Sequence, residues 1–183
     1  MIAIWPSNPR IFTAAVGAIL CCTYATLCAG FAVNARRHVQ ADALQQRISS
    51  VIHNTIEKSK VKLSSKESAL VMPILPSDED VRELKRHEKQ AIAILASYAT
   101  SAPALEQHVS LRILVQFSDH ATLPAIEDFA ERSLFGGIRQ EAISALNGFP
   151  PNEVRPILER LTKSDPDPAV RAHARRALAS ATQ

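Results

Sequence analysis

The sequence predicts an all-α protein in which a single N-terminal transmembrane helix is followed by a short α-solenoid of helical pairs. Three observations lead to this prediction. An uncharged apolar run extends from Ile11 to Val33, the C-terminal half alternates apolar-periodic segments with Pro, Gly and Asp punctuation, and this half repeats itself at a fixed interval. Apolar periodicity of this kind indicates amphipathic helices, and repetition at a fixed interval is typical of stacked helical units.

The composition agrees with helices and excludes a strongly basic, nucleic-acid-binding class. Hydrophobic residues make up 46% of the 183 residues, and the chain has only 5 glycines. The formal net charge is +3, but residues 80–183 hold 13 basic and 13 acidic residues. A nucleic-acid-binding surface needs a strongly basic face. We therefore expect no nucleic-acid partner, and one folded domain with an attachment segment.

Residues 11–33 form the predicted transmembrane helix, after a short tail of residues 1–10. At about 1.5 Å per residue the run reaches about 35 Å, enough to cross a hydrocarbon core of about 30 Å. Three arginines, Arg36, Arg37 and Arg47, follow the run, whereas Arg10 alone precedes it. By the positive-inside rule this asymmetry favours a single-pass membrane protein with a cytoplasmic C-terminal domain.

A cleavable secretory signal is the alternative for the same segment. Small residues lie where a signal peptidase could cut, in residues 30–32 and 33–35. The apolar run is longer than the usual signal core of about 7 to 15 residues, and Arg10 is its only preceding charge. Cleavage would leave a secreted, periplasmic repeat protein, so the two alternatives predict opposite sides of the membrane.

Small side chains follow one side of the predicted transmembrane helix. Such a stripe lets helix backbones approach closely, which would permit self-association or a membrane partner. All three cysteines lie in this segment, where we interpret them as small apolar residues and not as metal or redox ligands. The stripe consists of Ala14, Ala18, Cys21, Cys22, Ala25 and Ala29.

Residues 34–76 are predicted to form a helical stalk and a linker. Apolar residues at alternating spacings of three and four define one helix face, which either packs on the repeat domain or lies at the membrane surface. Pro73 and Pro76 end any helix, and Ser77 with Asp80 resembles a capping box that opens the next one. The face consists of Ala41, Leu44, Ile48, Val51 and Thr55.

Residues 77–183 form the predicted repeat domain, in which residues 81–100 are expected to be an N-terminal capping helix or degenerate repeat. Each unit is expected to be a first helix, a turn, a second helix with a proline in its first turn (Pro124 or Pro156), and another turn. No single pair can bury its apolar stripe alone, so the pairs must stack. A 32-residue shift superimposes Ile138, Arg139, Ala142, Ala145 and Leu146 on Val170, Arg171, Ala174, Ala177 and Leu178.

Two of these segments resemble HEAT repeats. DPDPAVRAHARRAL, residues 165–178, looks like the first helix of a HEAT repeat, and IRQEAISAL, residues 138–146, is a second copy. The likeness is to the short bacterial HEAT-like repeats, including those of phycobilin lyase subunits, although the interval is shorter than the usual length of about 40 to 47 residues. The resemblance implies an α-solenoid. It also implies that Arg139 and Arg171 have a structural role, in which they contact acidic or backbone groups of a neighbouring turn, with Asp165 and Asp167 as candidate partners of Arg171.

The sequence contains no recognisable catalytic, cofactor or metal site. His87 and Glu88 begin like a zinc-protease motif, but Ala91 stands where the second histidine ligand would be. Gly136 and Gly137 separate two predicted helices, where we expect them to provide turn geometry and not to hold phosphate. We therefore expect a protein that is not an enzyme and needs no cofactor.

The leading functional hypothesis is a membrane-anchored scaffold or adaptor that binds protein partners, because stacked repeats offer extended surfaces. The resemblance alone raises a lyase-like or chaperone-like accessory role as an alternative. A basic edge near the C-terminus would suit acidic proteins or lipid headgroups. This edge consists of Arg155, Arg160, Lys163, Arg171, Arg175 and Arg176.

Overall fold

The structure is a computed structural model that describes residues 39–59 and 75–181, and every regular element in these ranges is a helix. Residues 1–10, the predicted transmembrane segment 11–33 with its small-residue stripe, and residues 60–74 of the linker lie outside the described residues. In the part of the chain that is described, no helix is both long enough and apolar enough to cross a membrane.

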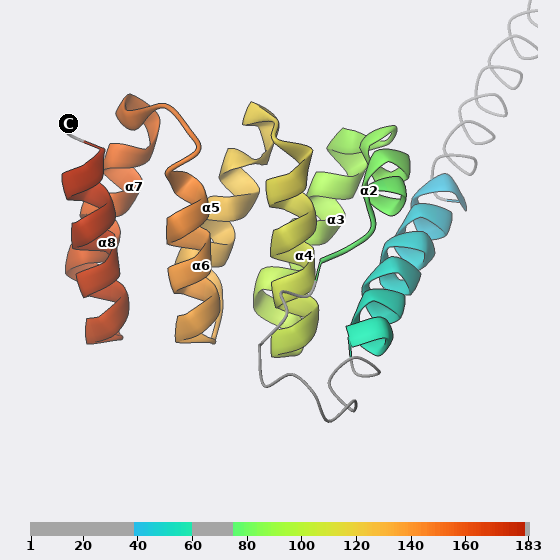
Figure 1. Ribbon diagram of the computed structural model, residues 1–183, viewed down its shortest axis with the longest axis horizontal. Coiled ribbons are helices and arrows are strands. Elements are labelled where there is room, and N and C mark those ends of the chain that lie inside the picture. The colour runs from blue at the N-terminus through green and yellow to red at the C-terminus, as the bar shows by residue number, and fades with distance from the viewer. Residues whose placement is uncertain (1–38, 60–74, 182–183) are drawn as a thin grey trace, which may run out of the picture. The chain divides into compact units, whose positions relative to one another are not determined.

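The helices stack in two layers. Figure 1 shows α4, α6 and α8 in the front layer and α3, α5 and α7 behind them, which confirms the predicted all-α, solenoid-like repeat. Residues 39–59 are also helical. The elements are α2 (Asp78–Lys85), α3 (Glu88–Ser101), α4 (Ala104–Phe117), the short 3-10 helix η1 (His120–Thr122), α5 (Leu123–Arg132), α6 (Gly136–Leu146), α7 (Pro151–Ser164) and α8 (Pro168–Ser180).

The closest pairs are α5 with α6 and α7 with α8. The proline-bearing helix therefore comes first in each packed pair, whereas the sequence predicted it second. Short turns explain this order, because residues 133–135 and 165–167 return the chain directly onto the preceding helix. The repeat interval is unaffected by the choice of starting helix. Consecutive pairs then meet through α6 and α8 in one layer and through α3 and α5 in the other.

Local signals fix where the helices begin. The Ser77 hydroxyl accepts a hydrogen bond from the Asp80 N–H at 3.2 Å, which confirms the predicted cap of α2. The Asp167 carboxylate caps α8 in the same way, through the Ala169 N–H at 2.8 Å, and Pro168 occupies its first turn. Each cap satisfies a backbone donor that the helix itself cannot satisfy.

Two helix boundaries differ from the prediction. Residues 81–100 were expected to be either a capping helix or a degenerate repeat, and the single helix is wrong because the chain turns at Arg86 and His87 and so forms α2 and α3. Pro156 lies inside α7 and not in its first turn, because α7 already begins at Pro151. Pro156 cannot donate to the carbonyl of Asn152, and both residues are exposed, so water can reach the carbonyl that is left free.

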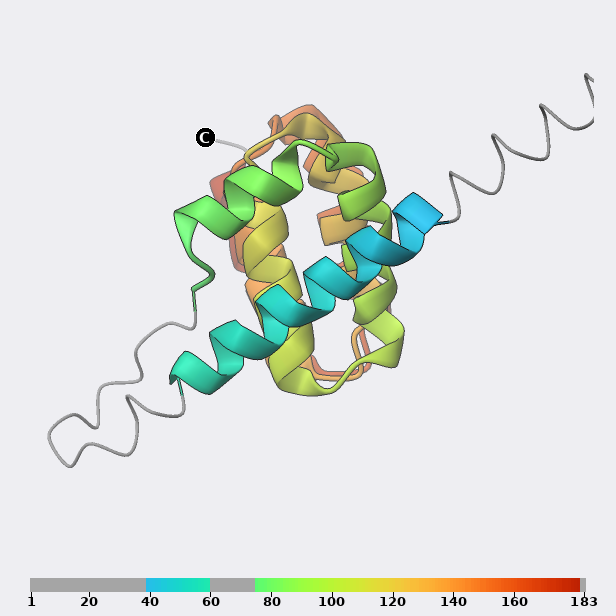
Figure 2. The same ribbon diagram turned by 90° about the vertical axis from the view of Figure 1, so that its right-hand side faces the viewer.

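Residues 44–59 belong to the same compact unit as the repeats. Figures 1 and 2 place this helix, coloured cyan, at the end of the stack beside α2 and α3. Arg47 NH2 lies 2.6 Å from Glu83 Oε2 of α2. Four of the five residues of the predicted helix face are buried and pack on the repeats, whereas Ala41 is half-buried. The buried residues of this helix are Leu44, Ile48, Val51, Ile52, Thr55 and Ile56, and all except Thr55 belong to one hydrophobic core with the other helices.

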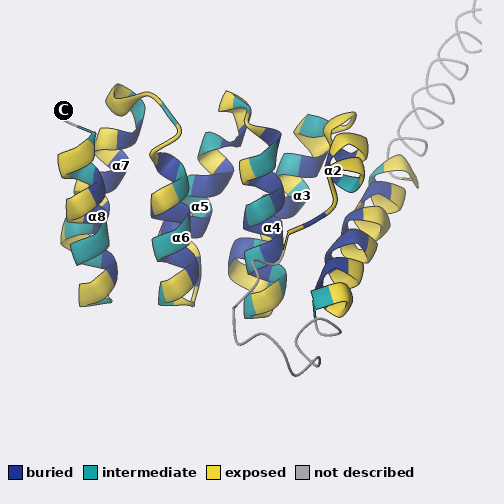
Figure 3. Cartoon of the chain, viewed as in Figure 1, coloured by how far each residue is buried: buried dark blue, intermediate teal, exposed yellow. Residues whose placement is uncertain are grey.

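Burial follows the predicted repeat face. Figure 3 shows buried residues on the sides of the helices that face one another across the two layers. Ala142 and Ala174, which occupy one repeat position on α6 and α8, are fully buried. Alanine at this position lets neighbouring helices approach closely, and Leu146 then fills the space between layers.

Candidate partner-binding face

A buried ion pair joins α6 to the turn between α7 and α8. The guanidinium of Arg139 donates from Nε and NH2 to the two carboxylate oxygens of Asp165, at 2.8 and 3.0 Å. Its NH1 donates to the Ser133 carbonyl at 2.8 Å. The Arg139 side chain is 7% exposed and that of Asp165 is 1% exposed, so each charge depends on the other for compensation. Arg139 thus has the structural role that the resemblance implied.

The same two positions meet at the preceding joint of the stack. Gln107 on α4 stands one repeat interval before Arg139, and Ser133 stands one interval before Asp165. The Ser133 hydroxyl donates to Gln107 Oε1 at 2.6 Å in a buried contact. A neutral pair therefore replaces the ion pair at this joint. The repeat interval predicts the contact, although neither residue was singled out from the sequence.

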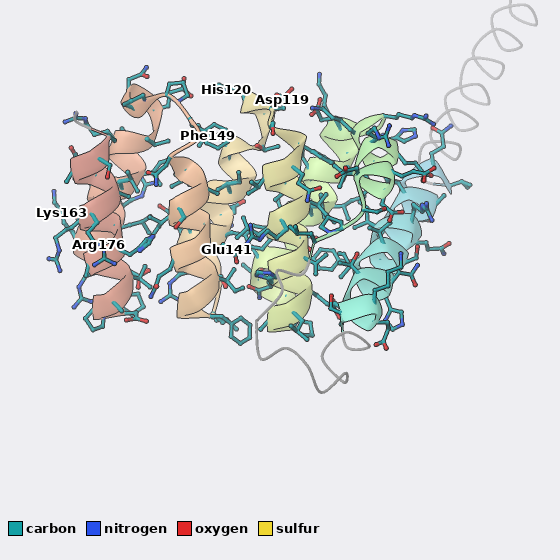
Figure 4. All side chains as sticks on the ribbon, in the orientation of Figure 1. Asp119, His120, Glu141, Phe149, Lys163 and Arg176 are labelled. Carbon is teal, nitrogen blue, oxygen red and sulfur yellow. The ribbon has the colours of Figure 1, made fainter. Side chains whose placement is uncertain are left out.

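A second contact, on the same helices, recurs in the same way. Arg112 Nε of α4 lies 2.6 Å from Glu141 Oε1 of α6, and His108 Nδ1 lies 2.7 Å from Glu141 Oε2. One interval later, the Ser144 hydroxyl of α6 lies 2.9 Å from Nε2 of His173 on α8. Figure 4 labels Glu141 between the front helices. At each joint, where one helical pair packs on the pair before it, we call α4 or α6 the inner helix and the following pair, α5–α6 or α7–α8, the incoming pair. The inner helix contributes two positions five residues apart, and the incoming pair contributes two positions eight residues apart.

His173 is neutral in this arrangement. Burial and the positive charge of Arg176 lower the pKa of its imidazole below the usual value of 6.5. Arg176 NH2 lies 3.3 Å from Nδ1 of His173, and a guanidinium can only donate. The proton of the ring is therefore on Nε2, which donates to the Ser144 hydroxyl.

Arg171 has no carboxylate partner among the described residues. Its NH1 donates to the backbone carbonyls of Asp165 and Pro166 at 2.6 and 3.1 Å, as Arg139 does to its own turn. The two carboxylates expected for it are occupied elsewhere, since Asp165 binds Arg139 and Asp167 caps α8. Arg171 thus contacts the backbone of the turn, one of the two kinds of group that the resemblance implied, and neither of the two candidate carboxylates.

Arg160 differs from the other residues of the predicted basic edge in that it forms ion pairs within the stack. It points back from α7 to α5, where its Nε and NH2 each lie 2.5 Å from a carboxylate oxygen, of Glu131 and Glu127 respectively. The hydrogen bond to Glu131 and the negative charges of both carboxylates raise the pKa of the Arg160 guanidinium above its ordinary value. Arg160 therefore compensates part of the negative charge of α5 and contributes to the contact between α5 and α7.

The other five cations occupy outward repeat positions of the last pair. Arg175 is exposed, whereas Leu111 and Ile143, at the same position of α4 and α6, are fully buried. Arg155 likewise stands one interval after Leu123, which packs against the core. Figure 4 shows Lys163 and Arg176 at this end of the stack. We call this surface the α7–α8 basic face; it consists of Arg155, Lys163, Arg171, Arg175 and Arg176.

The α7–α8 basic face is positively charged, because the carboxylates of α7, α8 and their turn do not compensate all of its cations. Glu153 lies 2.6 Å from Nε2 of His120, and the His120 ring also meets Phe149 edge-on. Figure 4 labels His120 and Phe149. Asp165 and Asp167 are occupied as described above. Glu159 is the one remaining carboxylate of α7 and α8 within the described ranges, and it is exposed. The five cations of this face outnumber the three carboxylates that no lysine or arginine of the described ranges pairs with, those of Glu153, Glu159 and Asp167, and this excess favours an acidic partner.

Comparison with protein families supports the repeat assignment. Residues 92–179 match the family model for HEAT repeats, a segment that extends from α3 to α8 and includes every joint described above. HEAT repeats generally mediate protein–protein interaction and are typically non-enzymatic, and no enzyme family is indicated. Comparison with curated proteins and with solved structures gives no match.

Proposed function

We propose that this chain is a membrane-anchored HEAT-repeat scaffold or adaptor that recruits a protein partner through the α7–α8 basic face. The observation that carries the proposal is the change of residue type at outward positions. Leu111 and Ile143 are buried by the next helix of the stack, whereas Arg175 at the same position is exposed. A terminal repeat with a polar outer face stays soluble, but an uncompensated cluster of arginines also attracts acidic partners.

The attachment belongs to the same proposal. Residues 11–33 would anchor the chain in a membrane, with the repeats on the cytoplasmic side. Only residues 34–43 separate this segment from Leu44, where the compact unit begins. A segment of this length spans at most about 35 Å when extended. The repeats would therefore be held to the membrane by a short tether.

A matched pair of charge variants tests the recruitment. The face variant carries Lys163→Gln, Arg175→Gln and Arg176→Gln, and the control variant removes three exposed cations at the other end of the stack, Arg82, Arg86 and Lys89. Both full-length proteins would be cross-linked in membranes and purified beside the wild type. We expect proteins that cross-link to the wild type and the control to be lost from the face variant. The proposal fails if the face variant retains them all.

A topology experiment tests the anchor. A reporter fused after Gln183 would show the compartment of the repeats, and the mass of the purified protein would show whether the N-terminal segment is retained. A cytoplasmic, uncleaved, membrane-bound product is expected. A processed and soluble product would instead support the secreted, periplasmic alternative, because cleavage near residues 30–35 removes about 30 residues.

A further inference from the structure

We propose that the partner of the α7–α8 basic face is an acidic helical hairpin that docks as a further pair would, with one carboxylate in its turn and a second one eight residues later. This inference rests on the proposed function and specifies the partner. The evidence is the pattern of residues at the two joints that the stack already contains.

Arginine at a joint is matched by a carboxylate. Arg139 on α6 meets Asp165 in the incoming turn, and Arg112 on α4 meets Glu141 on the incoming helix. Where Gln107 takes the place of Arg139 on the inner helix, the incoming residue is not acidic, because the Ser133 hydroxyl meets Gln107. At the remaining contact, His173 meets the Ser144 hydroxyl. In these four contacts, arginine on the inner helix meets a carboxylate, whereas Gln107 and Ser144 meet uncharged side chains.

The outer helix α8 carries arginine at both inner positions. Arg171 follows Gln107 and Arg139 in the repeat, and Arg176 follows Arg112 and Ser144. Nε and NH2 of Arg171 have no partner among the described residues, although the same two atoms of Arg139 hold Asp165. Arg176 is exposed, and its guanidinium contacts only the neutral ring of His173 in that part of the chain. Both joint positions are therefore cationic and open.

The incoming positions set the spacing of the partner's acids. Ser133 and Glu141 are eight residues apart, as are Asp165 and His173. The first of each pair lies in the turn of the incoming hairpin, and the second lies on its second helix. Eight residues correspond to about 12 Å along a helix. The partner is thus expected to carry an aspartate or glutamate at each of these two places.

A second copy of this chain fits the rule poorly. Its own last turn and helix would present Asp165, which is held by Arg139, and His173, which is not acidic. Arg175 and Lys163 on the facing copy would also repel the same face of the other. An isologous dimer through the α7–α8 basic face would therefore place like charges together.

Synthetic helical hairpins test the spacing. One hairpin carries Asp in its turn and Glu eight residues later, a second carries the same acids six residues apart, and a third carries Asn and Gln at the first spacing. Binding to the full-length protein in detergent would be followed by fluorescence anisotropy. We expect the first hairpin to bind most tightly, and each of Arg171→Gln and Arg176→Gln to weaken it about fivefold. Lys89→Gln, which removes a cation of α3, is the control and should change nothing.

Three outcomes would overturn the inference. Equal binding of the two acidic hairpins would show that the face has no preferred spacing. Binding of phosphatidylserine vesicles that is lost in both arginine variants, with no binding of hairpins, would identify a lipid surface. Concentration-dependent self-association lost in the same variants would identify a second copy. Equal binding of the two hairpins, or self-association, would leave the proposed recruitment of a protein in place. The proposed recruitment fails only if the face variant still cross-links to every protein that the wild type does.

Discussion

Replacement of Arg139 by methionine should destabilise the stack far more than replacement of Arg171, its equivalent on α8. Methionine keeps most of the aliphatic length of arginine but removes the charge that faces Asp165. The Asp165 side chain is only 1% exposed, and its one other donor in the described structure is the Asp167 N–H at 2.8 Å. An almost unpaired carboxylate would then remain buried, which costs about 3–5 kcal/mol in the free energy of unfolding.

Arg171→Met is the matched control. Arg171 donates only to the carbonyls of Asp165 and Pro166, and Pro166 is exposed, so water can replace part of this interaction. We expect a loss of at most about 1.5 kcal/mol. Combining Arg139→Met with Asp165→Asn removes both charges and keeps an acceptor for the Asp167 N–H. This double variant should be more stable than Arg139→Met alone, because a neutral pair carries no buried charge.

Urea unfolding of the full-length protein in detergent, followed by far-UV circular dichroism, measures these differences, and hydrogen exchange of amides in α6 to α8 locates them. The reasoning is refuted if Arg139→Met loses less than about 1 kcal/mol, since that is the range of an exposed ion pair. It is also refuted if the control loses as much as Arg139→Met, because burial of Asp165 would then not be the cause.

Three further changes follow from buried or crowded positions. Ser110→Ala should stabilise the fold by about 1 kcal/mol in thermal or urea unfolding, because the Ser110 hydroxyl is buried and has no hydrogen-bond partner among the described residues; no gain would mean that a bound water satisfies it. Gly136→Ala should leave the protein less stable than Gly137→Ala, because the new Cβ at residue 136 would lie 2.6 Å from a carboxylate oxygen of Asp167 and displace this cap of α8, whereas a Cβ at residue 137 meets nothing within 4 Å among the described residues. Equal unfolding midpoints for the two alanine variants would contradict this. His173 has a lowered pKa in the folded state, so below about pH 6.5 the unfolded chain takes up a proton that the folded chain does not, and stability falls. His173→Gln should therefore flatten the decline in stability between about pH 7 and pH 5.5, and an unchanged pH profile would show that another group causes the decline.

The fold was predictable because the spacing of apolar residues indicates both the repeat interval and the buried face of each helix. Leu44, Ile48 and Val51 mark a buried helix face by spacing alone, and the structure buries all three. The interval also correctly aligned α6 with α8. It could not decide which neighbour each helix packs on most closely, because a periodic pattern has no preferred starting point. Only the turns at residues 133–135 and 165–167 determine that choice.

The candidate face was partly predictable. The six cations were grouped by their nearness in the sequence, which cannot show that Arg160 turns back to Glu131 while Arg155 faces outward. Nothing in the residue types separates these two arginines. For Arg175 a signal was present, because the repeat interval aligns it with the apolar Ile143. A change from apolar residue to cation at one repeat position indicates a surface that the next unit does not cover.

The role expected for the two glycines at the start of α6 is wrong. Gly136 and Gly137 were expected to provide turn geometry, but both lie in the first turn of α6 with negative φ angles, where other residues are allowed. The requirement at Gly136 is close approach, since the Asp167 carboxylate occupies the space of a side chain. A contact with a residue of the following pair cannot be read from a local glycine pair.

One repeat position thus serves stability on α6 and recognition on α8. Arg139 is enclosed by the next helical pair and holds Asp165, whereas Arg171 leaves two donor atoms without a partner in the described structure. A buried ion pair adds little net stability over an apolar pair, but it penalises every register in which the charges fail to meet. The same selectivity would act on a docked partner. Substitutions at residue 139 should therefore reduce stability, and those at residue 171 should reduce binding while leaving the fold largely intact.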